Sequence, residues 1–165
     1  KMVIFTTNFG DIEIELDTTT APVTRKNFLQ YCEEGFYQGT IFHRVIKGFM
    51  IQGGGFTAKM KEKPTRESIV NEANRGLKNT LGTIAMARTD APHSASAQFF
   101  INTADNAFLD HFSTSNEGWG YCAFGQVTAG LEVIKQIEKV KTGMVAGHDD
   151  VPYEPIVIEQ VTIKE

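Results

Sequence analysis

The chain has 165 residues, of which 41% are hydrophobic and 22% are charged. This length and composition predict one globular domain, residues 1–165, with a single core. Sixteen basic and twenty acidic residues give a net charge of -4, so there is no global electrostatic case for binding nucleic acid. No apolar run approaches the ~18 residues of a membrane span, so we expect no membrane partner either.

The start of the chain lacks the basic and apolar segments of an export signal. The sequence therefore favours a cytoplasmic protein, with a periplasmic or otherwise exported form, whose leader has been removed, as the alternative. The two cysteines, Cys32 and Cys122, are far apart and fall inside apparently regular segments. We expect two buried thiols rather than a disulfide, which also favours the cytoplasm.

The first two segments, residues 2–7 and 10–16, alternate apolar and polar residues and predict a β-hairpin. A helical period follows over residues 22–34. Pro22 suits the first turn of this helix, and Gly35 is placed to end it.

The remaining pattern is typical of a mostly antiparallel β protein. Strands are predicted at 40–46, 49–52, 82–87, 98–102, 121–127 and 155–163, and a second helix at about 131–140. In the last strand the apolar phase slips between Ile158 and Val161, which predicts a β-bulge. Because many short strands would leave open edges, we expect the sheet to close into a barrel.

Residues 53–80 are mostly Gly, Lys, Pro, Asn and Glu and predict a long ordered excursion with little regular structure. The excursion contains four basic residues, Lys59, Lys61, Lys63 and Arg66. Because Glu62 and Pro64 interrupt them, we interpret this stretch as a solvated loop rather than a nucleic-acid site.

The histidines form no catalytic or metal-binding pattern. They are His43, His93, His111 and His148, and none stands in an HxH or HExxH relation. Strand alternation puts His43 on the face opposite Arg44, where we expect a hydrogen-bonded histidine at the edge of the core. Ser94 and Ser96 lie beside His93 but complete no nucleophile motif.

The segment FHRVIKGFMIQGGGF, residues 42–56, places one arginine and one glutamine in an apolar run. Taken alone, Arg44 could equally be a structural ion-pair partner, and the apolar residues around it could belong to the core. A charged group in such surroundings also suits a chemistry that needs no nucleophile, metal or shifted pKa.

This segment, together with GTIAMAR at 82–88, AQFFIN at 97–102 and FLD at 108–110, closely resembles the cyclophilins, the peptidyl-prolyl cis/trans isomerases. The resemblance covers essentially the whole chain, and GWGYCAFG at 118–125 makes it most like the small single-domain bacterial forms. It implies a closed eight-stranded antiparallel β-barrel capped by two helices, with the substrate groove on its outer surface. It also implies a monomer that uses no cofactor and no metal.

The resemblance assigns the site residue by residue. The catalytic residues would be Arg44 and Gln52, with Gln52 orienting Arg44 and bonding the substrate backbone. The proline ring pocket would be Phe49, Met50, Phe99 and Leu109, with Phe108 and Tyr121 at its rear. The strand that pairs with the substrate main chain would contain Ala87 and Arg88, and Gln98 would line the neighbouring surface.

The expected substrates are proline-containing peptides and partly folded proteins, on which the enzyme would accelerate X-Pro rotation and so assist folding. Two other functions stay open: a binding module that holds a proline segment of one partner, and a general chaperone that uses the same groove. Two residues depart from many eukaryotic members. Phe108 replaces a tryptophan, which predicts weak binding of cyclosporin, and Tyr121 replaces a histidine.

Overall fold

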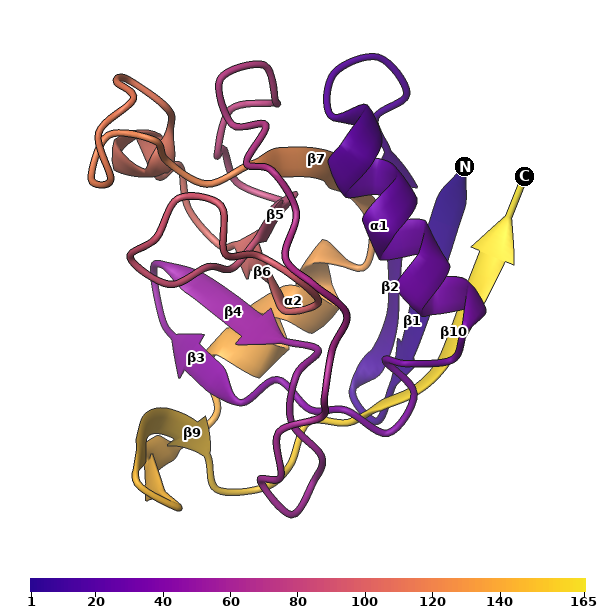
Figure 1. The fold of residues 1–165 in the computed structure, drawn as a ribbon. Helices are drawn as coiled ribbons and strands as arrows, with labels where there is room; N and C mark the ends of the chain where they lie inside the picture. The colour runs from indigo at the N-terminus through magenta and orange to yellow at the C-terminus, as the bar shows by residue number, and fades with distance from the viewer.

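A strongly curled sheet of eight antiparallel strands forms the body of the computed structural model, which describes residues 1–165 (Figure 1). In chain order its strands are β1 (Met2–Thr7), β2 (Gly10–Leu16), β3 (Arg44–Ile46), β4 (Met50–Gly53), β5 (Thr83–Met86), β6 (Phe99–Asn102), β7 (Ala123–Ala129) and β10 (Ile158–Lys164). Their order across the sheet is β10-β1-β2-β7-β5-β6-β4-β3. The predicted eight-stranded antiparallel, mostly β architecture is therefore confirmed.

The curl of the sheet is not completed by a full strand pair, because the edge strands β3 and β10 do not pair with each other. The gap is bridged by the irregular segment that precedes β3 and by residues at and just before the start of β10. Phe42 N donates to Ile156 O at 3.0 Å, and Ile158 N donates to Thr40 O at 2.8 Å. The structure is thus a half-barrel joined by a few hydrogen bonds, and the expected full closure is corrected in this respect.

The predicted bulge lies in β10. Thr6 of β1 pairs with Gln160, and the next residue, Thr7, pairs with Ile158, which leaves Glu159 as the extra residue. This position falls inside the apolar phase slip between Ile158 and Val161. Because β1 and β10 pair along their length, the two ends of the chain lie side by side (Figure 1).

Two helices, α1 (Pro22–Glu33) and α2 (Leu131–Glu138), pack against the curled sheet, close to their predicted limits. Both contribute to one apolar cluster of 27 buried residues. Phe28 and Tyr31 enter it from α1, and Ile134 and Ile137 enter it from α2. The same core therefore fixes both helices and the inner face of the sheet. None of the helices is long and apolar enough to cross a membrane.

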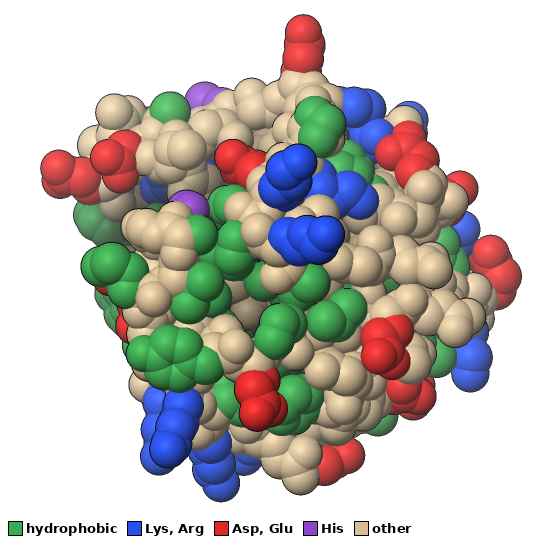
Figure 2. Space-filling model, turned by 90° about the horizontal axis from the view of Figure 1, so that it is seen from below, with side chains coloured by type: hydrophobic (Ala, Val, Ile, Leu, Met, Phe, Trp, Pro, Cys, Tyr) green, Lys and Arg blue, Asp and Glu red, His purple; other side chains and the backbone are tan.

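A small second sheet, β8 (Thr142–Val145) and β9 (His148–Pro152), was not predicted from the sequence. Its sequence lacks clear alternation, and its turn needs positive φ angles at both Ala146 and Gly147, the first of which is not a glycine. A short 3-10 helix, η1 (Ala107–Leu109), was also missed. Figure 2 shows the face seen from below in Figure 1, where hydrophobic side chains form separate patches among charged ones.

The excursion between β4 and β5 is fixed by contacts with α1, which agrees with the prediction that it is ordered. Ala21 precedes α1 and offers no side-chain cap. Instead the buried carboxylate of Glu72 accepts hydrogen bonds from Val23 N at 3.3 Å and from Thr24 N and Oγ1 at 2.7 Å each. A carboxylate at a helix N-terminus satisfies free N–H groups and complements the helix dipole.

Of the four basic residues of the excursion, Lys59 and Lys61 are exposed, whereas Lys63 and Arg66 are only partly exposed. Lys63 Nζ donates to Phe36 O at 2.6 Å. The guanidinium of Arg66 lies 3.9 Å from the ring centre of Tyr31 and pairs with Glu34. These two cations therefore anchor the loop to the end of α1 and the turn that follows it.

Both cysteines are buried free thiols, as predicted. Burial raises the pKa of the Cys32 thiol well above its ordinary value, and it raises the pKa of Cys122 to about 11. Neither thiol is therefore ionised near neutral pH.

His43 is buried and faces away from Arg44, but it is not the hydrogen-bonded residue that we expected. Its Nδ1 has no hydrogen-bond partner. Its ring lies 4.5 Å from that of Phe56, which in turn lies 5.1 Å from that of His148. Burial, and to a smaller extent the nearby His148 and Arg44, lowers the pKa of His43 to about 4. The apolar surroundings thus keep this imidazole neutral.

Replacing Glu72 by alanine should lower the free energy of unfolding by about 1–3 kcal/mol, since it leaves the first N–H groups of α1 without an acceptor. Urea denaturation measures this change. The exposed Glu67, on the same excursion, provides the control, because Glu67→Ala should have little effect. Equal stabilities of the Glu72 and Glu67 variants would contradict the assigned capping role.

The free energy of unfolding should fall as pH is lowered from about 6.5 to 4, because the unfolded chain then binds a proton at His43 that the folded protein does not. The shift in pKa corresponds to a loss of about 3 kcal/mol for this residue. Urea denaturation at pH 7 and pH 4.5 should show a smaller acid loss in His43→Leu than in wild type. An identical loss in both proteins would rule out this assignment.

Candidate active site

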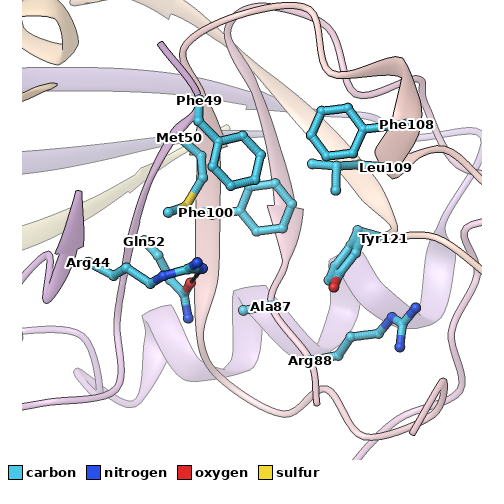
Figure 3. A pocket seen from close by; sticks show the side chains of 10 residues that line it. All are labelled: Arg44, Phe49, Met50, Gln52, Ala87, Arg88, Phe100, Phe108, Leu109 and Tyr121. Atoms are coloured by element: carbon cyan, nitrogen blue, oxygen red, sulfur yellow. Dashed lines mark hydrogen bonds between the residues drawn. The ribbon is translucent and has the colours of Figure 1, made fainter. Parts of the chain in front are cut away.

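A groove of ≈ 500 Å³ lies on the outer surface of the sheet. Its walls come from β3 and β4, the end of β5, β6, η1 and the segment before β7. The residues that line it are Arg44, Phe49, Met50, Gln52, Ala87, Arg88, Phe100, Phe108, Leu109 and Tyr121 (Figure 3). Nine of these ten were predicted from the sequence, and the structure brings all nine together.

The hairpin of β3 and β4 positions the two polar residues of the groove. Its turn uses Gly48 at a φ of 77°, a left-handed conformation that suits glycine. The register pairs Arg44 with Gln52, so both side chains project on the same face. Arg44 Nη1 donates to Gln52 Oε1 at 3.3 Å. The strand register thus produces the predicted Arg44–Gln52 contact.

Arg44 makes no ion pair: the two salt bridges of the structure are Lys1–Glu165 and Arg66–Glu34. Its side chain is exposed at the edge of the groove, and Gln52 is its only side-chain hydrogen-bond partner. The alternative of a structural ion pair for Arg44 therefore finds no partner. Its remaining N–H donors are free to meet a ligand.

Gln98 lies beside the groove rather than in it. Gln52 Nε2 donates to Gln98 Oε1 at 3.0 Å, and Gln98 Nε2 donates to Glu62 Oε2 at 3.4 Å. Glu62 and Gln98 line two smaller polar depressions, one of which shares Gln52, Ala87 and Arg88 with the groove. The hydrogen-bond chain Arg44–Gln52–Gln98–Glu62 therefore continues the polar edge of the groove along the surface.

The floor of the groove is apolar. Met50, Phe100 and Leu109 are buried in a small cluster separate from the main core. Phe49 stacks on Phe108 with ring centres 5.7 Å apart, and Phe108 keeps 69% of its surface exposed. An apolar floor with an open aromatic rim suits a small apolar ring that enters from solvent.

Phe99 does not reach the groove, and its predicted place in the ring pocket is corrected. It is fully buried in the main core, with its ring 5.3 Å from those of Phe5 and Tyr37. Successive side chains of β6 point to opposite faces, so the residue on the groove side is Phe100. Sequence analysis missed Phe100, although its position two residues from Gln98 placed both on one face.

Ala87 and Arg88 lie on the far side of the groove from Phe49 (Figure 3). Ala87 N donates to Gln98 O at 3.0 Å, so this N–H is already used within the sheet. The guanidinium carbon of Arg88 lies 4.6 Å from the ring centre of Tyr121. The ring of Tyr121, which forms this wall of the groove, also packs edge-on against the ring of Phe100, with ring centres 5.7 Å apart.

The arrangement offers two guanidinium groups, those of Arg44 and Arg88, and the amide of Gln52 beside an apolar floor. No group of three or more His, Cys, Asp or Glu side chains is placed to hold a metal ion. No histidine, serine or cysteine lines the groove. The groove is therefore built to bind an apolar group and to donate hydrogen bonds at its edge.

Comparison with known proteins agrees with this geometry. The model of the family described as cyclophilin type peptidyl-prolyl cis-trans isomerase/CLD matches residues 2–163. Peptidyl-prolyl cis-trans isomerase B of Escherichia coli (strain K12) is 60% identical over 164 residues, which cover 99% of this chain and 100% of that protein. A peptidyl-prolyl cis-trans isomerase of Streptomyces antibioticus is 57% identical and covers 95% of both chains.

A solved structure extends the agreement to the fold. The crystal structure of a cyclophilin type peptidyl-prolyl cis-trans isomerase of Cryptosporidium parvum, in the presence of the dipeptide Ala-Pro, has a TM-score of 0.81 and 28% identity. The match covers 100% of this chain and 99% of that one. With the family match over nearly the whole length, it shows that the chain belongs to the cyclophilin-type peptidyl-prolyl cis-trans isomerases.

Proposed function

We propose that the groove binds an X-Pro segment with the proline ring on the floor of Met50, Phe100 and Leu109, and that Arg44 promotes rotation of the X-Pro bond. The observation that carries this proposal is the guanidinium of Arg44, which has no acidic partner and is oriented by a hydrogen bond to Gln52 at the edge of an apolar floor. The Cryptosporidium parvum relative, solved in the presence of Ala-Pro, supports a proline-containing ligand.

Rotation about an X-Pro bond is slow because it breaks amide resonance, with a barrier of roughly 18–20 kcal/mol. In the twisted transition state the proline nitrogen becomes pyramidal and regains a lone pair. A donor aimed at this nitrogen binds the transition state better than either planar state, which is the condition for raising the rate. Arg44 can supply that donor at any relevant pH, because its guanidinium stays protonated.

The apolar floor has two roles in this mechanism. It fixes the ring, so that the preceding carbonyl rotates instead of the whole substrate. It also excludes water, which would otherwise stabilise the planar, more dipolar ground state. An acceleration of about 10⁵-fold requires ~7 kcal/mol, which one charged hydrogen bond, desolvation and positioning can supply together.

The same groove could hold a proline segment of one partner without catalysing rotation, or an apolar segment of any unfolded chain. A proline clamp needs the aromatic walls but not the contact between Arg44 and Gln52, so this contact favours catalysis. A general chaperone would protect clients that lack proline. Light scattering during aggregation of a proline-free client distinguishes this function from isomerisation.

The proposed substrates are proline-containing peptides and partly folded proteins, and the proposed acting form is the monomer. We also propose a cytoplasmic location, since two buried, unpaired thiols suit a reducing compartment. Phe108 is expected to give weak cyclosporin binding, because a phenylalanine ring has no N–H to donate.

Arg44→Ala should lower kcat/KM for an X-Pro peptide by about 10²- to 10³-fold, the usual cost of removing one transition-state donor. A protease-coupled peptide assay measures the rate, and calorimetry should show nearly unchanged peptide affinity. Lys47→Ala removes an exposed cation from the adjoining turn and should retain wild-type activity. If Arg44→Ala still isomerises at near wild-type rate with unchanged affinity, the proposed mechanism is wrong.

Phe108→Trp should raise the affinity for cyclosporin about tenfold, since it adds one hydrogen-bond donor to an exposed aromatic rim. Isomerase activity should change little, because Phe108 lies at the rim rather than on the floor. Titration of both proteins with cyclosporin tests this. Equal affinities would show that residue 108 does not set cyclosporin binding.

A further inference from the structure

The guanidinium of Arg88 is almost fully committed to the backbone of the protein itself. Its Nε donates to Gly120 O at 2.9 Å, and its Nη2 donates to Asn116 O at 3.2 Å. Its Nη1 donates to Thr89 O at 2.9 Å and to Asp90 O at 3.4 Å. A guanidinium has five N–H groups. Four contacts therefore leave the side chain little capacity to bond a substrate, whereas the predicted pairing of Ala87 and Arg88 with a substrate main chain would use backbone groups.

The carbonyls that Arg88 contacts belong to two different loops. One is the turn that follows β5, and the other is residues 111–120, which we call the rim loop. The carbonyl of Gly120 accepts a second hydrogen bond, from Asn71 Nδ2 at 3.0 Å. Arg88 thus connects the two loops at a point that a buried side chain also fixes.

The rim loop leads directly into the Tyr121 wall of the groove. Tyr121 N donates to Leu109 O at 2.8 Å, which fixes its backbone beside η1. Its ring is held between the guanidinium of Arg88, at 4.6 Å, and the ring of Phe100, at 5.7 Å. A cation over an aromatic face is attractive, so Arg88 acts on both the backbone and the ring of this wall.

We propose that the side chain of Arg88 is a positioning group that fixes the rim loop and the Tyr121 wall and does not itself donate to the substrate. This inference rests on the proposed function, because the wall matters only if the groove binds an X-Pro segment. Lysine cannot replace arginine in this role. Its ammonium is a single point of charge, whereas the planar fork of arginine reaches carbonyls in both loops at once.

A tryptophan within the rim loop can report on the order of this loop. Trp119 is the only tryptophan, and its ring lies 4.9 Å from the rings of both His93 and His111. His111 Nδ1 also donates to Trp119 O at 2.8 Å. Quenching of Trp119 fluorescence by acrylamide therefore measures the order of the rim loop independently of any substrate.

The test compares Arg88→Ala and Arg88→Lys with Arg75→Ala, which removes an exposed arginine and serves as the control. In both Arg88 variants, acrylamide quenching of Trp119 should increase. Their kcat/KM for an X-Pro peptide should fall about tenfold or more, mainly through KM, because the wall is displaced while Arg44 is intact. Arg75→Ala should match wild type in both measurements. Wild-type quenching in Arg88→Lys, together with recovery of most activity, would overturn the proposal.

A second measurement covers the case in which Arg88→Ala is poorly folded. In a Tyr121→Leu background the wall is already lost, so Arg88→Lys should cost less activity there than in wild type. Equal losses in both backgrounds would also overturn the proposal, because they would place the effect of Arg88 elsewhere. If the wild-type protein shows no isomerisation, the proposed function fails, whereas the quenching result still decides whether Arg88 orders the rim loop.

Discussion

The register of β3 against β4 is the constraint on which the site depends. It places Arg44 opposite Gln52, and the turn at Gly48 lets the two short strands keep that register. A shift by one residue would turn Arg44 toward the side where His43 is buried, in surroundings that already lower the pKa of His43 to about 4. A permanent cation there would lack the compensation that burial requires. The same packing that keeps His43 neutral thus keeps Arg44 at the solvent edge of the groove.

In β6, the alternation of side chains places one phenylalanine in the core and the next one in the groove. Phe99 fills the main core, and Phe100 forms the floor of the groove on the other face. The floor is fixed because its strand is shared with the core, so the binding surface needs no rearrangement to receive an apolar ring. The wall that is not part of a strand, at Tyr121, is held instead by Arg88 and by the backbone of η1. One side of the groove therefore belongs to the sheet, and the other side belongs to loops.

The sequence predicted what depends on local pattern. Alternation located the first hairpin, and the phase slip after Ile158 located the bulge at Glu159. Most site residues were found only through family resemblance, because neither spacing nor composition relates Arg44 to Leu109. The capping of α1 by Glu72 and the contacts of Arg88 were not predicted, since each joins residues that only the tertiary fold brings together. The error at Phe99 was avoidable, because strand alternation places it opposite Gln98.

The central claim is that the charge of Arg44 acts on the twisted X-Pro bond and adds little to binding of the planar forms. The most direct measurement replaces Arg44 by citrulline, which keeps the shape of arginine but is neutral. NMR exchange spectroscopy then gives the cis–trans rate of a saturating bound peptide. We predict a rate about tenfold or more below wild type at nearly unchanged affinity, because citrulline keeps neutral N–H donors but loses the charge-assisted hydrogen bond. A near wild-type rate in the neutral variant would contradict the account.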